Sequence, residues 1–207
     1  MNVVEMFYSL QGEGKHIGRP TFFVRFGGCN LDCLWCDTRY AAVEGEEMDR
    51  SEVFKACKEY KLICLTGGEP LLQDELPELV RALVAEGKEV VVETNGSLDI
   101  STLPDHPLVT VSMDIKCPSS GMTNRMDMDN IHRLKPKDQL KFIVNDGYDL
   151  EFALSVLESY KPCCEAIFSP VGGMDMEPLV EEILFRRLDV RVLPQLQKII
   201  WGPRRGV

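Results

Sequence analysis

The sequence lacks the features that direct proteins to membranes or out of the cell. No apolar run in its 207 residues approaches the ~20 residues needed to span a bilayer. The first residues, Met1 to Glu5, contain no basic stretch followed by an apolar segment, so we expect no signal peptide. Internal repeats, low-complexity segments and linkers are also missing, and we therefore expect one domain over residues 1–207.

Clustered basic residues are scarce as well. The formal net charge is -10, and the basic pair Arg204-Arg205 is the only such cluster near a terminus. Proteins that bind the phosphates of nucleic acids need clustered Lys and Arg, so we expect no nucleic-acid partner. Eight cysteines without a secretory signal indicate a reducing compartment and metal chemistry. We therefore expect a cytoplasmic protein with no membrane partner.

Three of the cysteines are concentrated in one short loop. Cys29, Cys33 and Cys36 lie within eight residues, at the spacing Cys-x3-Cys-x2-Cys. Thiolates prefer soft metals, and a four-iron cluster ordinarily takes four cysteine ligands. Three ligands would leave one iron open to bind a small molecule and pass it an electron, as open positions do in catalytic metal sites.

The spacing alone leaves a structural zinc knuckle open as an alternative, formed by the same thiols with a histidine. No histidine lies inside the loop, the nearest being His16 and His106, so we favour the cluster. The scattered remaining cysteines are interpreted as small buried side chains (Cys57, Cys64, Cys117, Cys163 and Cys164).

Apolar runs alternate with helical patterns along the chain. Runs rich in β-branched and aromatic residues predict strands at 21–26, 61–66, 89–94, 108–113, 139–144, 165–169 and 189–193. Apolar positions at helical spacing predict helices at 50–60, 72–86, 148–160 and 176–187. This alternation predicts an α/β fold with a parallel sheet and right-handed crossovers.

Unusual polar segments follow the predicted strands. The cysteine loop follows the first strand, and the next three strands are followed by Thr66-Gly67-Gly68-Glu69-Pro70, Glu93-Thr94-Asn95-Gly96 and Asp114-Ile115-Lys116. Ligands of parallel sheets bind at the carboxyl ends of the strands. The sequence therefore predicts a ligand site at this end of the sheet.

The cysteine spacing together with Gly67-Gly68-Glu69-Pro70 resembles the radical S-adenosylmethionine (SAM) superfamily. This resemblance implies a [4Fe–4S] cluster held by Cys29, Cys33 and Cys36, with SAM on the open iron. Because 207 residues are fewer than the ~250 of a full eightfold barrel, the fold it implies is a partial, modified (β/α) barrel.

A closer resemblance covers residue 7 to the Trp201-Gly202-Pro203 segment. It is carried by Ser9-Leu10-Gln11-Gly12-Glu13-Gly14, Trp35-Cys36-Asp37-Thr38, Glu93-Thr94-Asn95-Gly96, Asp114-Ile115-Lys116 and Leu193-Pro194-Gln195-Leu196. Together these segments resemble the 7-carboxy-7-deazaguanine synthase family. The implied activity is conversion of 6-carboxy-5,6,7,8-tetrahydropterin to 7-carboxy-7-deazaguanine and ammonia by radical ring contraction, for deazapurine nucleosides such as queuosine or archaeosine.

The resemblance also implies which residues bind each ligand. Those expected at SAM are Trp35, Cys36, Asp37, Gly68, Asp114, Ile115 and Lys116, and those expected at the pterin are Leu10, Gln11, Gly12, Arg25, Thr66 and Gln195. Mg²⁺ is expected at Thr38, although Asp-Thr is also common in turns and helix caps. Glu69 has a second interpretation as an acidic residue at a helix start.

One departure from the family pattern lies at Gln197, where histidine is usual before the lysine. The resemblance further implies a homodimer and a one-electron donor of the flavodoxin or ferredoxin type. Two alternatives remain from the thiol loop: a radical SAM activase acting on a partner protein, and a non-catalytic iron–sulfur or zinc protein. The Ser9–Gly14 and Asp37-Thr38 features fit the pterin enzyme better than an activase, and a carrier needs neither an open iron nor the Gly67-Gly68-Glu69-Pro70 turn.

Overall fold

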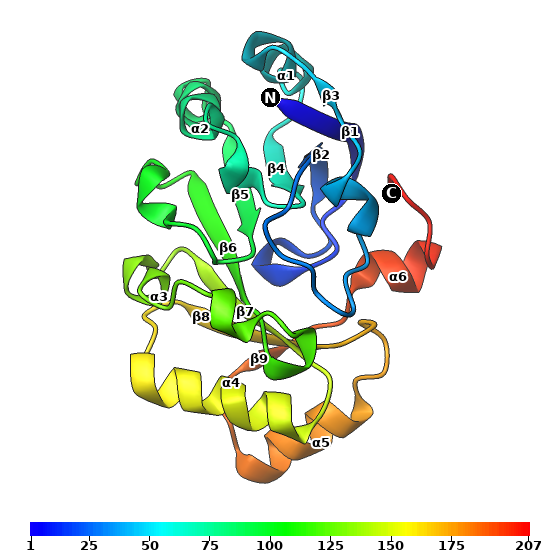
Figure 1. The fold of residues 1–207 in the computed structure, drawn as a ribbon, viewed down its shortest axis with the longest axis vertical. Helices are drawn as coiled ribbons and strands as arrows, with labels where there is room; N and C mark the ends of the chain where they lie inside the picture. Colours follow the sequence, from blue (N-terminus) through cyan, green and yellow to red (C-terminus); the bar gives the residue numbers. More distant parts are fainter.

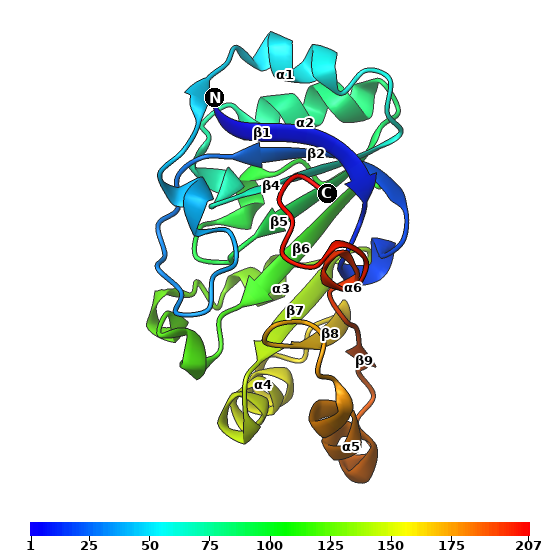
Figure 2. The same ribbon diagram turned by 90° about the vertical axis from the view of Figure 1, so that its right-hand side faces the viewer.

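One curved sheet contains all nine strands of the protein. The computed structural model describes residues 1–207, and the strand order is β3-β1-β2-β4-β5-β6-β7-β8-β9. Strand β1 pairs antiparallel with β2 and β3, whereas β2 and the strands from β4 onward run parallel to one another. The sheet does not close on itself, and Figures 1 and 2 show it curving from β1 to β9. The predicted partial barrel is confirmed.

The strands lie close to the predicted ranges. Their bounds are β1 Asn2–Leu10, β2 Pro20–Phe26, β3 Glu46–Glu47, β4 Leu62–Gly67, β5 Glu89–Thr94, β6 Val109–Ile115, β7 Gln139–Val144, β8 Glu165–Pro170 and β9 Arg191–Val192. The sequence did not predict β1, which is only partly buried and therefore has no continuous apolar run. The last strand is shorter than predicted, with two residues.

Six α-helices connect or follow the strands. Their bounds are α1 Arg50–Ala56, α2 Leu76–Ala85, α3 Asn130–Arg133, α4 Gly147–Tyr160, α5 Glu177–Arg186 and α6 Leu196–Trp201. Helix α2 begins four residues later than predicted, because Pro70–Leu72 form a separate 3₁₀ turn followed by extended Gln73. Figures 1 and 2 show α1, α2, α4 and α5 on the outer side of the sheet.

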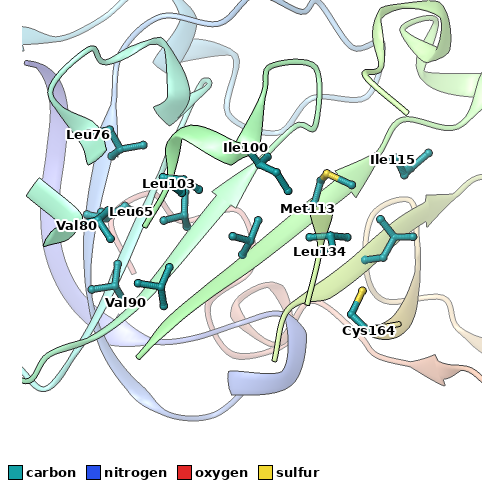
Figure 3. Close-up of a cluster of buried hydrophobic side chains, with 14 of the residues drawn as sticks. Leu65, Leu76, Val80, Val90, Ile100, Leu103, Met113, Ile115, Leu134 and Cys164 are labelled. Carbon is teal, nitrogen blue, oxygen red and sulfur yellow. The ribbon is translucent and has the colours of Figure 1, made fainter. Parts of the chain in front are cut away.

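The hydrophobic core lies between the outer helices and the sheet. Helix α2 buries Leu76, Leu79, Val80 and Leu83 completely, which is the apolar stripe expected from their spacing. Figure 3 shows Leu76 and Val80 near strand residues such as Leu65. Each such side chain contributes about 1.5–3 kcal/mol by leaving water. This core fixes the strands whose ends carry the polar segments.

No helix of the protein is both long and apolar enough to cross a membrane.

Candidate active site

The cysteine loop lies between β2 and a 3₁₀ turn at Arg39–Ala42. Arg39 is exposed and stabilises the loop, since its Nη2 donates to the carbonyl oxygens of Cys33 at 3.1 Å and Leu34 at 2.8 Å. Trp35 Nε1 donates to Ser119 Oγ at 3.1 Å, which ties the loop to the segment after β6. The loop is therefore fixed by contacts from two directions.

All three thiols of the loop line one cavity of about 440 Å³. Burial raises the pKa of Cys29 and of Cys33 in the metal-free protein. Asn95 Nδ2 lies 3.9 Å from Cys29 Sγ and is placed to donate to that sulfur. No group of three or more His, Cys, Asp or Glu side chains is close enough to hold a single metal ion. A cluster makes a different demand, because its cysteines bind separate irons, and three thiols around one cavity fit it.

The Gly67-Gly68 turn packs directly against the cysteine loop. A Cβ on Gly68 would lie 2.0 Å from the carbonyl oxygen of Gly28, so only glycine permits this approach. The next residue, Glu69, is fully buried and is not on the cavity. Its carboxylate accepts from Leu71 N at 3.0 Å and Asn95 N at 2.7 Å. Glu69 thus caps the following 3₁₀ turn and fixes Asn95, in line with its interpretation as an acid at a helix start.

Almost every residue predicted for a ligand site lines this cavity. The lining includes Leu10, Gln11, Gly12, Arg25, Cys29, Cys33, Trp35, Cys36, Asp37, Thr38, Thr66, Gly68, Asp114, Lys116 and Gln195. The exception is Ile115, whose side chain is buried in the hydrophobic core and leaves only its main chain for a ligand. Sequence segments far apart in the chain therefore meet at the predicted end of the sheet.

Two lysines and two carboxylates form a row of ion pairs along the cavity lining. Lys141 Nζ lies 2.7 Å from Glu13 Oε2 and 3.2 Å from Asp114 Oδ1, and Lys116 Nζ lies 2.9 Å from Asp114 Oδ2. Burial raises the pKa of Asp114, but the two ammonium groups outweigh it and lower this pKa to about 2. Burial lowers the pKa of Lys141, yet the carboxylates of Asp114 and Glu13 hold it well above its ordinary value. All four groups are therefore charged at neutral pH.

Arg25 adds a further positive charge to the cavity lining. Its Nε donates to Glu5 Oε1 at 2.7 Å, and Tyr40 donates to the same oxygen at 2.9 Å. The two terminal nitrogens of Arg25 donate to no protein group, and the residue lines the cavity. On the far side of Glu5, Arg205 Nε donates to Oε2 at 3.1 Å. The Arg25 guanidinium is thus held by its Nε and keeps its outer nitrogens for a ligand.

The oxygens of Asp37 and Thr38 have different surroundings. Asp37 is half exposed and pairs with Lys198 of α6 at 3.0 Å. Thr38 precedes the 3₁₀ turn but makes no capping hydrogen bond with its side chain. Its hydroxyl oxygen lies 3.8 Å from Cys36 Sγ on the cavity wall. The hydroxyl is therefore available to a ligand at the edge of the thiol loop.

Comparison with known proteins agrees with this geometry. Residues 23–165 match the Radical SAM superfamily. The chain is 39% identical over 209 residues to the 7-carboxy-7-deazaguanine synthase of Thermoplasma acidophilum, covering 100% of both chains. It is 42% identical over 206 residues to that of Methanospirillum hungatei, covering 98% of this chain and 86% of the relative. The chain belongs to the 7-carboxy-7-deazaguanine synthase family of radical SAM proteins.

A solved structure supports the fold independently. QueE from Escherichia coli superimposes with a TM-score of 0.72 at 23% identity, covering 92% of each chain. The radical SAM family implies a [4Fe–4S] cluster and SAM as cofactors, and the predicted iron–sulfur interpretation is confirmed over zinc. The enzymes of this family carry out radical ring contraction in deazapurine biosynthesis.

Several polar residues that line the cavity were not singled out from the sequence as ligand residues, among them Glu13, Glu93, Asn95, Lys141 and Gln197. Lys141 gave one local signal, since it is the only charged residue in the fully buried strand Gln139–Val144. Gln11 lines the cavity, but its Nε2 donates to Glu93 Oε1 at 3.0 Å, so its amide orients this carboxylate.

Gln197 stands where the family pattern usually has histidine. Its Nε2 donates to Glu13 Oε1 at 3.1 Å, beside the 2.7 Å bond from Gln195 Nε2 to the same oxygen. The amide therefore supplies a donor at this position. Its own carbonyl oxygen is buried and has no partner in the protein.

Proposed function

We propose that this protein converts 6-carboxy-5,6,7,8-tetrahydropterin to 7-carboxy-7-deazaguanine with release of ammonia, as a single domain over residues 1–207. The observation that carries the proposal is the meeting of the three thiols and the family's polar segments around one cavity. At about 440 Å³ this cavity falls within the range of small-molecule sites.

Cys29, Cys33 and Cys36 would hold the cluster and leave it one iron without a protein ligand, where SAM would bind. Together with one electron, the cluster and SAM would supply radical chemistry at this site. Asn95 supports the thiolate of Cys29 through its amide, because hydrogen bonds to cluster sulfurs stabilise their negative charge. The protein's other task is to orient both ligands and exclude water.

The cofactor half of the cavity lies beside the cysteine loop. We assign SAM to Trp35, Cys36, Asp37, Gly68, Asp114, Lys116 and the main chain of Ile115. The absence of a side chain on Gly68 lets the backbone approach the methionyl group. Lys116 lies 5.9 Å above the Trp35 ring and pairs with Asp114, so this pair presents polar groups to the nucleoside.

The substrate half lies between β1, β2, β4 and the segment after β9. We assign the pterin to Leu10, Gln11, Gly12, Arg25, Thr66 and Gln195. The free terminal nitrogens of Arg25 match a carboxylate, which the substrate carries at its 6-position. Gln11 acts through Glu93, which it holds at 3.0 Å.

We assign Mg²⁺ to Thr38. A hydroxyl is a hard oxygen ligand, and Mg²⁺ binds few protein groups and keeps several waters. The Thr38 hydroxyl is not used for capping and lies on the cavity wall next to the thiol loop. Mg²⁺ at this position would supply positive charge to an oxygen-rich substrate in the cavity.

The reaction also needs partners outside the cavity. We propose a one-electron donor of the flavodoxin or ferredoxin type, a homodimeric assembly and a cytoplasmic location. The donor follows from the chemistry, since the cluster must receive an electron for each SAM cleaved. The dimer rests on the family resemblance, and the location rests on the eight cysteines without a secretory signal.

Anaerobic assay of the reconstituted protein tests the proposed function. Protein with SAM, a reductant, Mg²⁺ and 6-carboxy-5,6,7,8-tetrahydropterin is expected to yield 7-carboxy-7-deazaguanine and ammonia. Replacing Cys33 by Ala should remove cluster iron and product. Cys163 is exposed, so its interpretation as a buried side chain was wrong, and because it also lies off the cavity the control Cys163→Ala should keep both. Cleavage of SAM without consumption of the pterin would reject the proposal in favour of an activase.

A further inference from the structure

Lys141 connects two parts of the cavity that come from opposite regions of the sheet. It lies on β7, and its side chain is 6% exposed. Its ammonium contacts Glu13, which follows β1, at 2.7 Å and Asp114, near the end of β6, at 3.2 Å. The contact with Glu13 is a hydrogen bond, whereas the contact with Asp114 Oδ1 is an ion pair without one. An ammonium has three N–H donors, so Lys141, which also lines the cavity, has donors to spare.

The two carboxylates belong to different halves of the site. Asp114 pairs with Lys116, which lies 5.9 Å above the ring of Trp35 in the cysteine loop. Glu13 follows directly after Gln11 and Gly12, and its Oε1 accepts from Gln195 at 2.7 Å. Lys141 is therefore the one cation in direct contact with both the SAM half and the pterin half.

Removing this cation would disturb both halves together. Glu13 and Asp114 would face each other without the ammonium between them, and like charges in a buried setting repel strongly. Each carboxylate would turn toward water or toward its remaining donors, Gln195 and Gln197 for Glu13 and Lys116 for Asp114. The distance between Glu13 and Asp114, and so between the two halves of the cavity, therefore depends on the Lys141 ammonium.

We propose that Lys141 is a positioning residue that holds the SAM half and the pterin half of the cavity in register. This inference rests on the proposed function, because it assigns the two halves to these two ligands. If this is so, loss of the ammonium should weaken the binding of both ligands. It should also make radical formation less often lead to product.

The test compares Lys141→Met and Lys141→Arg with the unaltered holoenzyme. The matched control is Lys137→Met, which makes the same change at a lysine just before the same strand, outside the cavity lining. Binding of SAM and of the pterin is measured by calorimetry on the oxidised, reconstituted protein, where no turnover occurs. Because Lys141→Met leaves a buried charge unpaired, the double variant Glu13→Gln/Lys141→Met is made in parallel to keep the fold.

For Lys141→Met, or for the double variant if the single one does not fold, both dissociation constants are expected to rise by roughly tenfold. The amount of 5′-deoxyadenosine formed per deazaguanine should also rise, which a uniform loss of folded enzyme would not produce. Lys141→Arg should recover part of both effects, and Lys137→Met should match the unaltered protein. Unchanged binding, or weakening of only one ligand, overturns the proposal.

The two proposals fail in different ways. If the unaltered protein binds SAM and the pterin but makes no deazaguanine, the proposed function fails and the binding arm still decides the role of Lys141. If it makes deazaguanine and Lys141→Met binds both ligands normally, the role of Lys141 fails alone.

Discussion

Glu13 and Gln195 are 182 residues apart in the chain, yet Gln195 Nε2 donates to Glu13 Oε1 over 2.7 Å. The neighbouring main chains are joined as well, because Leu196 N donates to the carbonyl oxygen of Gly12 at 2.9 Å. Figure 2 shows α6, which begins at Leu196, beside the end of β1. These bonds join the segments after β1 and β9, both of which contribute residues to the cavity lining, although β1 and β9 do not pair with each other.

Gly68→Ala is expected to disrupt the cysteine loop and to lower the free energy of unfolding by about 1–3 kcal/mol. The added Cβ would meet the carbonyl oxygen of Gly28 at 2.0 Å and the Cβ of Cys29 at 3.0 Å, and main chain cannot move aside cheaply. Urea unfolding and iron content are the measurements. Gly147→Ala is the control, since nothing lies within 4 Å there, and it should keep full iron and stability. Normal iron content in Gly68→Ala would contradict this account of the turn.

Thr38→Ala is expected to weaken the response of turnover to Mg²⁺ by about tenfold or more in apparent metal affinity. The variant loses the hydroxyl but keeps the three thiols, so its iron content should not change. Product formation is measured against Mg²⁺ concentration. Thr38→Ser keeps the oxygen and should keep the response. An unaltered Mg²⁺ profile in the alanine variant would remove Thr38 from the metal site.

Asp114 should stabilise the fold in a way that depends on pH. Burial raises its pKa, but Lys116 and Lys141 outweigh burial and bring it to about 2 from an ordinary value of 3.8. A lowered pKa means that the carboxylate stabilises the fold above pH 3.8 and that this contribution is lost as the pH falls toward 2. The shift corresponds to about 2 kcal/mol.

The check is urea unfolding of cluster-free protein, comparing the unaltered chain with Asp114→Asn. The difference in the free energy of unfolding should be constant from neutral pH down to about pH 5 and should shrink below pH 4. A difference that persists unchanged to pH 2.5 would show that the two lysines do not lower the pKa of Asp114.

Much of the fold was predictable because parallel strands are buried on both faces and read as apolar runs. Strands β4, β5 and β7 lie within one residue of the prediction for this reason. Strand β1 was missed because it pairs antiparallel near the edge and is only partly buried. Helix α6 was also not predicted, being six residues long with no buried side chain.

In the site too, features encoded by a short local pattern were predicted, and contacts between distant segments were not. Residues in short motifs, such as Cys29 and Gly68, were found because their spacing or their turn chemistry is local. The ion pairs of Lys141 with Glu13 and Asp114 join three separate segments, and no local pattern specifies which lysine meets which carboxylate. Such partnerships depend on how the sheet curves, which is a property of the packed fold.

Gly12 and Gln197 should behave as a coupled pair. A Cβ on Gly12 would lie 1.8 Å from Gln197 Oε1 and 2.6 Å from its Cδ, so Gly12→Ala must displace the glutamine from Glu13. Gln197→Ala loses the same bond without a clash, and it also removes a buried oxygen that has no partner. A hydrogen bond to a charged group contributes about 1.5–3 kcal/mol, so each single variant should bind the pterin roughly tenfold more weakly.

In the double variant Gly12→Ala/Gln197→Ala the methyl group enters space that the glutamine has left. Its effect on pterin binding should therefore be no larger than that of Gly12→Ala alone, whereas independent effects would multiply to roughly a hundredfold. Calorimetric titration of the oxidised, SAM-loaded protein with the pterin distinguishes the two results. Multiplying effects would mean that Gly12→Ala weakens pterin binding without displacing Gln197, and that Gln197 does not act on the pterin through Glu13.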